Sequence, residues 1–158
     1  MSTMVLPISK THTETVVHTI GYEGLAVEIF LAKLRKNGIR RIIDIRCNAF
    51  SRKPGFSKSR LSAVLQEHGI DYVHIPQLGI PSSLRKNLHD PEDYAGLFKI
   101  YVKEILPTVE EYIEEALSLI DEEPSALLCF EKDYSQCHRS HLSWWLCKYY
   151  GIRQNHVQ

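Results

Sequence analysis

The segment from Cys129 to Arg139 carries more chemically reactive side chains than any other stretch of comparable length. Within eleven residues it holds two thiols, two carboxylates, a lysine, an arginine and a histidine. It follows an apolar run, residues 125–128, and precedes a helical pattern over residues 138–150. Ligands of α/β proteins bind where strands end and helices begin. We therefore expect this segment to form one wall of a functional site.

Three residues are candidates for reacting groups: Glu131, Cys137 and Asp44. Glu131 follows a predicted strand, where a partly desolvated carboxylate can act as general base or nucleophile. Lys132 and Arg139 can equally neutralise it, so a structural role stays open. Asp44 stands two residues before Arg46, and in an extended strand both side chains point to the same side. Asp44 then either anchors the loop or binds a ribose hydroxyl. The alternative is an ion pair at the strand end.

The cysteines allow several interpretations. A phosphatase loop requires an arginine six positions after its cysteine, and none follows Cys47, Cys129 or Cys137 at that spacing. Cys137 and His141 lie four residues apart on one predicted helix face, and Cys129 could join them around zinc, but no Cys-x-x-Cys motif occurs. We expect no zinc, because the ligand spacing is poor, and no disulfide between Cys129 and Cys137, because the thiol content suits the cytoplasm. We also expect no cofactor.

A basic block covers the predicted loop after the second strand. Nine lysines and arginines stand between residues 35 and 60 against one acid, Asp44. Arg46 can bind a phosphate with two N–H groups, and Ser57 is a predicted N-cap whose helix start favours anions. A solvated basic surface is the alternative. The predicted substrate-binding residues are Tyr22, Arg46, Ser51, Arg52, Tyr72, His138, Arg139 and His156.

Strand and helix patterns alternate along the chain. Apolar runs predict strands at residues 16–20, 41–45, 71–75 and 125–129, with a short edge strand at 156–157. Helical patterns lie between them, the last two before the fourth strand at residues 94–103 and 107–122. The pattern predicts a three-layer, Rossmann-like α/β fold: a mainly parallel sheet of about five strands with helices on both faces. The expected strand order is 3-2-1-4-5.

Length and charge limit the class of protein. The 158 residues predict a single α/β domain over 16–158, preceded by a disordered leader or tag at 1–15. No apolar run approaches the roughly 20 residues of a membrane span, so we expect a cytoplasmic protein with no membrane partner. The net charge of zero argues against broad, non-specific nucleic-acid binding.

Seven short motifs occur in a characteristic order: residues 19–24 (TIGYEG), 44–46 (DIR), 51–56 (SRKPGF), Tyr72 with 78–79 (LG), 129–132 (CFEK), 137–139 (CHR) and 156–157 (HV). In this respect the chain resembles the family called domain of unknown function 488. The resemblance implies a Rossmann-like α/β fold and names no reaction. It marks Asp44, Arg46, Ser51, Arg52, Tyr72, Glu131, Cys137, His138, Arg139 and His156 as characteristic polar positions. The chain departs from the family at residues 47–50 (CNAF), where a proline is frequent.

These residues predict a hydrolase or transferase that acts on a phosphate-bearing small molecule, a nucleotide or a nucleic-acid end. The site would lie in a crevice at the carboxyl ends of the strands. A non-catalytic module that binds nucleotide or nucleic acid in the same crevice is the alternative. A rhodanese-like sulfur-transfer protein is the second alternative, because residues 44–46 and 137–140 partly resemble its motifs.

Overall fold

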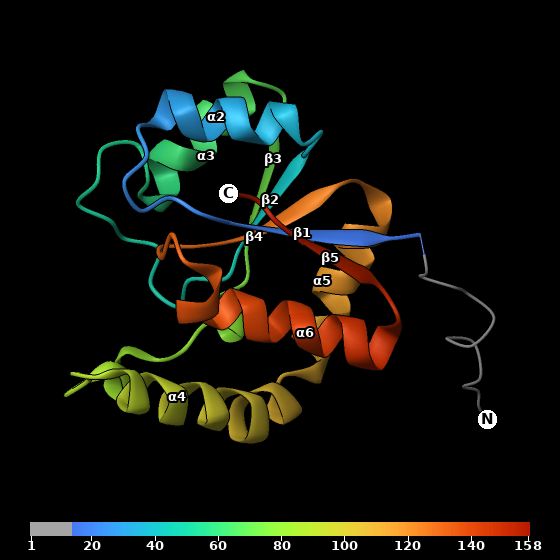
Figure 1. Ribbon diagram of the computed structural model, residues 1–158. Coiled ribbons are helices and arrows are strands. Elements are labelled where there is room, and N and C mark those ends of the chain that lie inside the picture. The colour runs from blue at the N-terminus through green and yellow to red at the C-terminus, as the bar shows by residue number, and fades with distance from the viewer. Residues whose placement is uncertain (1–13) are drawn as a thin grey trace.

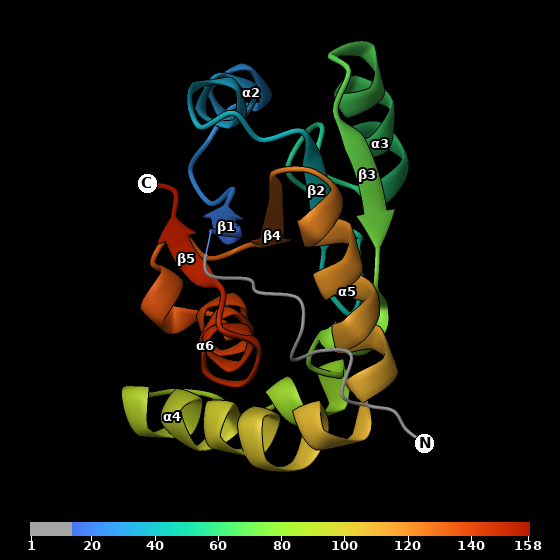
Figure 2. The same cartoon turned by 90° about the vertical axis from the view of Figure 1, so that its right-hand side faces the viewer.

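The computed structural model describes residues 14–158, so most of the predicted leader at 1–15 lies outside the described residues. Its centre is one parallel sheet of five strands. The strands are β1 (Val16–Gly21), β2 (Arg41–Asp44), β3 (Asp71–His74), β4 (Ser125–Cys129) and β5 (Arg153–His156). Helices cover both faces of this sheet (Figures 1 and 2). The predicted fold class is therefore confirmed.

The strand order is β3-β2-β4-β1-β5, so the predicted order 3-2-1-4-5 is wrong. β4 lies between β1 and β2, where Leu127 is level with Thr19 on one side and Ile43 on the other. All five residues of β4 are buried, whereas β3 and β5 at the two edges contain exposed residues. A strand that is apolar on both faces gains most from a central place in a parallel sheet.

Alternate strand residues supply two separate cores. On one face, Ile42 and Leu128 pack against α2 (Val27–Lys36) and α3 (Lys58–Glu67). On the other, Ile43 and Leu127 pack against α5 (Glu110–Glu122) and α6 (His138–Tyr150). This division follows from the twofold alternation of side chains along a strand. Figure 2 shows α2 and α3 on one side of the sheet and α5 and α6 on the other.

The helix α4 (Pro91–Ile100) lies beyond α6, farther from the sheet (Figure 2). It begins earlier than the predicted residue 94, because the Asp90 side chain accepts a hydrogen bond from the Asp93 amide at 2.9 Å and Asp93 reciprocates. A π-helical segment, Tyr101–Ile105, and a 3-10 turn, Leu106–Thr108, join it to α5, which begins at Glu110 instead of Pro107. Within residues 14–158, no helix is long and apolar enough to cross a membrane.

The connections that leave β1 and β4 place a crevice between them. These strands are neighbours, yet β1 leads into α2 on one face of the sheet while β4 leads into α6 on the other. Loops that diverge from adjacent parallel strands open a gap at the carboxyl edge. The fold thus opens a crevice next to residues 129–139, the segment rich in reactive side chains.

Candidate functional site

A crevice of about 320 Å³ opens at this edge of the sheet. Segments far apart in sequence contribute to it: the ends of β1 and β4, the loop after β2, and the segment around residues 80–85. Its walls combine aromatic rings, polar groups and sulfur. The lining residues are Tyr22, Arg46, Cys47, Asn48, Phe50, Ser51, Ile80, Ser82, Arg85, Cys129, Phe130, Glu131 and His138.

Asp44 and Arg46 form a buried ion pair at the inner end of the crevice. The guanidinium donates to both carboxylate oxygens, at 2.9 Å from Nε and 2.7 Å from Nη2. Its Nη1 donates to the Tyr22 hydroxyl at 3.0 Å and to the Phe56 carbonyl at 2.8 Å. Four of the five N–H donors of an arginine are therefore engaged within the protein. Sequence analysis left an ion pair between Asp44 and Arg46 as the alternative to a ligand contact, and the structure shows this ion pair.

Tyr72 completes the network around Asp44. Its hydroxyl donates to Asp44 Oδ2 at 2.5 Å, and the Arg46 amide donates to Oδ1 at 3.1 Å. Burial raises the pKa of Tyr72 well above its usual value, and the Asp44 charge raises it further. Burial by itself lowers the pKa of Arg46, but the hydrogen bonds and attraction to Asp44 outweigh it and raise that pKa. The raised pKa values keep Tyr72 and Arg46 protonated at neutral pH, which suits a scaffold more than a proton donor.

Arg139 shapes the loop that follows β4. Its side chain is fully buried and donates to the carbonyl oxygens of Glu131 at 2.5 Å and Lys132 at 3.3 Å, and to Cys129 Sγ at 3.4 Å. Its Nε has no hydrogen-bond partner among residues 14–158. Burial lowers the pKa of Arg139 to about 10, although Glu131 and Asp133 oppose that shift. Arg139 holds the crevice wall from behind and does not line the crevice.

Glu131 is the carboxylate that the structure leaves available to a ligand. It lines the crevice and is half-buried. Its side chain makes no hydrogen bond or ion pair with the described part of the chain, whereas its carbonyl is held by Arg139. The neighbouring backbone is fixed as well, because Glu23 binds the Phe130 carbonyl through its amide and the Lys132 amide through its carboxylate. The Glu131 carboxylate is thus carried on an immobilised backbone.

His138 is a buried, neutral imidazole. Its Nε2 lies 2.9 Å from the Ile45 carbonyl oxygen, which can only accept, so the proton is on Nε2 and Nδ1 carries the lone pair. Nδ1 faces Arg85 Nη2 at 3.4 Å. Burial lowers the pKa of His138 to about 3, and the hydrogen bond to Ile45 only partly opposes this shift. The histidine therefore serves as a donor to the backbone and an acceptor toward the crevice.

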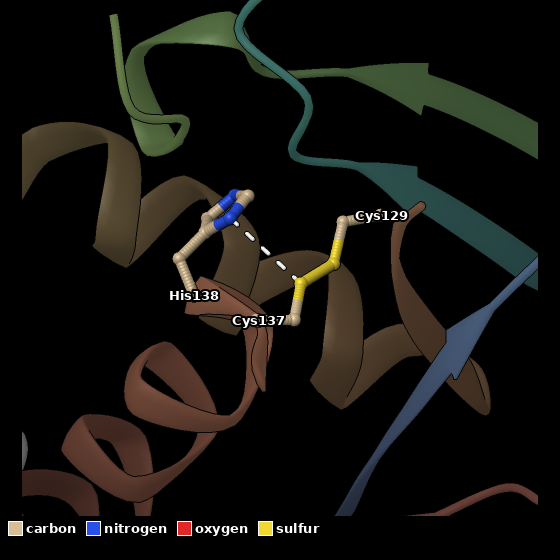
Figure 3. Close-up of side chains that lie close together, drawn as sticks. All are labelled: Cys129, Cys137 and His138. Atoms are coloured by element: carbon tan, nitrogen blue, oxygen red, sulfur yellow. Dashed lines mark hydrogen bonds between the residues drawn. A yellow bond between two sulfur atoms is a disulfide. The ribbon is translucent and has the colours of Figure 1, made fainter. Parts of the chain in front are cut away.

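Cys129 and Cys137 are joined in a disulfide, so the prediction of no disulfide is wrong (Figure 3). Cys129 ends β4 and Cys137 precedes α6, and the 3-10 turn Tyr134–Gln136 brings the chain back between them. Their side chains and His138 also form a group with ligand atoms within 4.8 Å of one another. His141, the histidine considered for zinc, instead packs on Phe98 at 4.7 Å between ring centroids.

The remaining predicted residues divide between the crevice and its surroundings. Ser51 lines the crevice, and its backbone is tied to Ser57 Oγ at 2.9 and 2.8 Å. Arg52 is exposed and lies outside the lining set. Tyr72 borders a separate hollow on α3. His156 bonds Thr19 Oγ1 at 2.7 Å and stacks on Tyr134, behind the crevice.

Among the lining residues that were not predicted as site residues, three bear on ligand binding: Phe50, Phe130 and Arg85. Phe50 and Phe130 resemble core residues by type, yet they are 68% and 43% exposed. Phe130 directly follows the buried strand at residues 125–129, so its ring lies at the carboxyl edge of the sheet. Its place in the sequence could therefore have marked it as a lining residue. Arg85 lies in the long segment between residues 76 and 91, and nothing local in the sequence indicates that it reaches His138.

The fold and this crevice define an α/β protein with a polar site at the switch point of a parallel sheet. The chain belongs to the family described as Domain of unknown function DUF488, whose family model matches residues 26–146. That match covers the Asp44, Glu131 and Cys137 motifs and leaves out the motifs at residues 19–24 and 156–157. Neither the curated proteins nor the solved structures that were compared with the chain contain a match.

Proposed function

We propose that this protein is an enzyme, of hydrolase or transferase type, that binds a nucleotide or a phosphate-bearing nucleic-acid end in the crevice. The observation that carries the proposal is the pair of exposed rings, Phe50 and Phe130, on the rim of a hollow with polar and cationic walls. Exposed aromatic rings beside cationic groups suit the stacking of a nucleobase, which contributes about 1–3 kcal/mol per base.

Arg85 is the cation best placed for the phosphate. Apart from His138, it makes no hydrogen bond or ion pair within residues 14–158, and it is half-buried in the crevice wall. Arg46, the predicted anion clamp, has one N–H left after its internal bonds. The main phosphate contact therefore moves from Arg46 to Arg85, with Asn48, Ser51 and Ser82 available to polar groups of the sugar.

Glu131 supplies the chemistry in this proposal. A carboxylate on the same wall as Phe130 can take a proton from water or attack an electrophilic carbon of the bound ligand. A binding module would use the same crevice and leave Glu131 without a reacting role. The sulfur-transfer alternative needs a free thiol at Cys129 or Cys137, and in the structure both sulfurs are joined in the disulfide. No contact that the described residues make in the crevice favours it over the nucleotide proposal.

The test is a thermal-shift titration with nucleoside phosphates, sugar phosphates, short oligonucleotides and inorganic phosphate. Arg85→Gln is expected to weaken binding of all of them about tenfold, because a charge-assisted contact contributes roughly 1.5–3 kcal/mol. Phe50→Ala is expected to weaken binding of compounds with a base and to leave inorganic phosphate unchanged. Arg60→Gln is the matched control, since Arg60 is an exposed cation on α3 outside the crevice.

Glu131→Gln separates the enzyme from the binding module. We expect the Glu131→Gln variant to retain ligand binding and to lose turnover of the compound that gives the largest thermal shift. Chromatography of the products measures this turnover. Turnover that survives in Glu131→Gln removes Glu131 from the mechanism. If the wild-type protein is stabilised by none of these compounds, the crevice is not a phosphate site and an interaction module becomes the better description.

A further inference from the structure

Two cysteines form part of the crevice wall, and the proposed nucleotide chemistry does not use them. Cys129 and Cys137 are joined in a disulfide, with His138 beside them (Figure 3). We propose that this pair is a reversible thiol–disulfide exchange site. Its reaction partner would be a small thiol, or a protein dithiol, that enters the crevice. The inference stands on the cysteine geometry and is independent of any phosphate-bearing ligand.

The two sulfurs differ in their position relative to the crevice. Both cysteines are almost fully buried, Cys129 at 2% and Cys137 at 1% exposed, but Cys129 lines the crevice and Cys137 does not. An incoming thiolate therefore meets Cys129 Sγ first. Exchange proceeds by attack of a thiolate on one sulfur of a disulfide, and access selects which sulfur is attacked.

Cys137 is built to be the leaving sulfur. It is the N-cap of the 13-residue helix α6, where the unpaired amides and the helix dipole stabilise a thiolate. An independent feature lies on its other side: His138 Nδ1 is 3.9 Å from Cys137 Sγ and carries a lone pair, because Nε2 donates to Ile45. The same nitrogen lies 3.4 Å from the Arg85 guanidinium. The imidazole can accept from the Cys137 thiol in the reduced state, and Arg85 adds positive charge nearby.

Cys129 has a cation of its own. Arg139 Nη1 donates toward Cys129 Sγ at 3.4 Å. A hydrogen bond from a guanidinium favours the thiolate over the thiol at this position. Each sulfur thus has a group that stabilises it when the bond between them is broken.

The bonds and electrons of the exchange balance with a thiol as the only co-reactant. A thiolate bonds to Cys129 Sγ, the bond between the two cysteine sulfurs breaks, and its electron pair stays on Cys137 as a thiolate. A second thiolate then attacks the sulfur of the bound thiol and releases Cys129 as a thiolate and the co-reactant as its own disulfide. Two thiols are oxidised, the protein disulfide is reduced by two electrons, and the thiolates take protons from water. A disulfide of the same class drives the reverse reaction.

The test uses the full chain with Cys47→Ser and Cys147→Ser, which removes the two cysteines outside the pair. The protein is equilibrated with mixtures of reduced and oxidised glutathione, alkylated, and mapped by mass spectrometry. We expect both thiols to convert together and reversibly to one disulfide between Cys129 and Cys137. The proposal is overturned if the thiols stay reduced over the whole series, if they react only after denaturation, or if the reduced protein holds stoichiometric zinc that blocks oxidation.

The order of attack has its own measurement in the same background. Cys137→Ser should accumulate a glutathione mixed disulfide at Cys129, whereas modification of Cys137 in Cys129→Ser should be about tenfold slower or more, because Cys137 does not line the crevice. Equal rates in the two folded variants contradict the assignment of Cys129 as the attacked sulfur. If either variant fails to fold, limiting glutathione on the intact pair identifies the attacked sulfur by peptide mapping.

Discussion

Two buried arginines hold the walls of the crevice, and both do so by binding groups of their own chain. Arg46 is 7% exposed and neutralises Asp44, which has no exposed surface. Arg139 binds carbonyl oxygens of the loop after β4, and its Nε has no partner in the part of the chain that the structure describes. A buried arginine whose N–H groups bind its own chain positions other groups of the protein. Contacts with a ligand are then made by residues nearer the rim of the crevice.

Arg46→Ala is therefore expected to destabilise the protein more than it weakens ligand binding. The substitution leaves the buried Asp44 carboxylate with Tyr72 and an amide but without a cation. Breaking a buried ion pair by removing one partner costs about 3–5 kcal/mol. Urea unfolding followed by circular dichroism measures this loss. Arg52→Ala is the control, because Arg52 is exposed and its removal should change stability by less than about 0.5 kcal/mol.

The opposite result is just as informative. If Arg46→Ala unfolds at the urea concentration of the wild type and loses phosphate binding, Arg46 is a ligand contact, as the sequence alone predicted. Removing both charges, with Asp44→Leu and Arg46→Met together, should restore part of the stability, since no unpaired charge then remains.

Sequence reasoning placed some of the predicted residues on the crevice and could not find their bond partners. Of the three residues predicted as reacting groups, Glu131 lines the crevice, whereas Asp44 and Cys137 do not. Arg46 and His138, predicted to bind substrate, line it as well. The bond partners depend on distances across the fold: Arg46 with Phe56, His138 with Ile45 and Arg139 with the loop at Glu131. No local pattern encodes these distances, so a free clamp and a buried ion pair look the same in the sequence.

At the scale of elements, the loop after β4 is positioned by its close packing against the end of β1. A Cβ added at Gly21 would lie 2.7 Å from the Glu131 carbonyl carbon and 2.8 Å from Arg139 Nη1. Both obstacles are fixed, because Arg139 and the Glu131 carbonyl are bonded to each other. The end of β1 therefore sets the position of the wall that carries Glu131, and only glycine fits there.

Gly21→Ala should displace that wall. We expect a loss of about 1–3 kcal/mol in stability from overpacking, together with weaker ligand binding. Gly96→Ala is the control within α4, where an added Cβ meets no atom within 4 Å, and it should stabilise the protein by about 0.5–1 kcal/mol. Thermal unfolding of the two variants gives both values. Equal stability of Gly21→Ala and the wild type would mean that the loop moves freely away from β1.

At the scale of the whole molecule, the elements were predictable and their order was not. Strand and helix patterns gave all five strands to within a few residues, because alternation and apolar runs are local properties. The place of β4 in the sheet depends on which strand buries most apolar surface when it has a neighbouring strand on each side. Residues Ala126 to Leu128 are apolar on both faces, whereas β5 is Arg-Gln-Asn-His, and this contrast favours β4 at the centre and β5 at an edge. Weighing the apolar content of the strands would have given the observed centre.

Buried histidines make the stability of the whole molecule depend on pH. Burial lowers the pKa of His18, His138, His141 and His156, and that of His138 to about 3. Between pH 3 and 6.5, the unfolded chain binds a proton at residue 138 that the folded protein does not. The stability contributed by the neutral His138 is therefore fully present above pH 6.5 and is lost as the pH falls through this range, by roughly 1.4 kcal/mol per pH unit.

His138→Gln should make the protein less sensitive to acid, even though it lowers stability at neutral pH. Glutamine keeps an N–H donor for the Ile45 carbonyl and cannot take up a proton, so the slope of stability against pH between 4 and 6 should fall by roughly 1.4 kcal/mol per pH unit. Urea unfolding at several pH values measures the slope. His89→Gln is the control, because His89 is exposed and its removal should leave the slope unchanged. An unchanged slope in His138→Gln would show that His138 titrates alike in the folded and unfolded states, and hence that its imidazole is open to solvent.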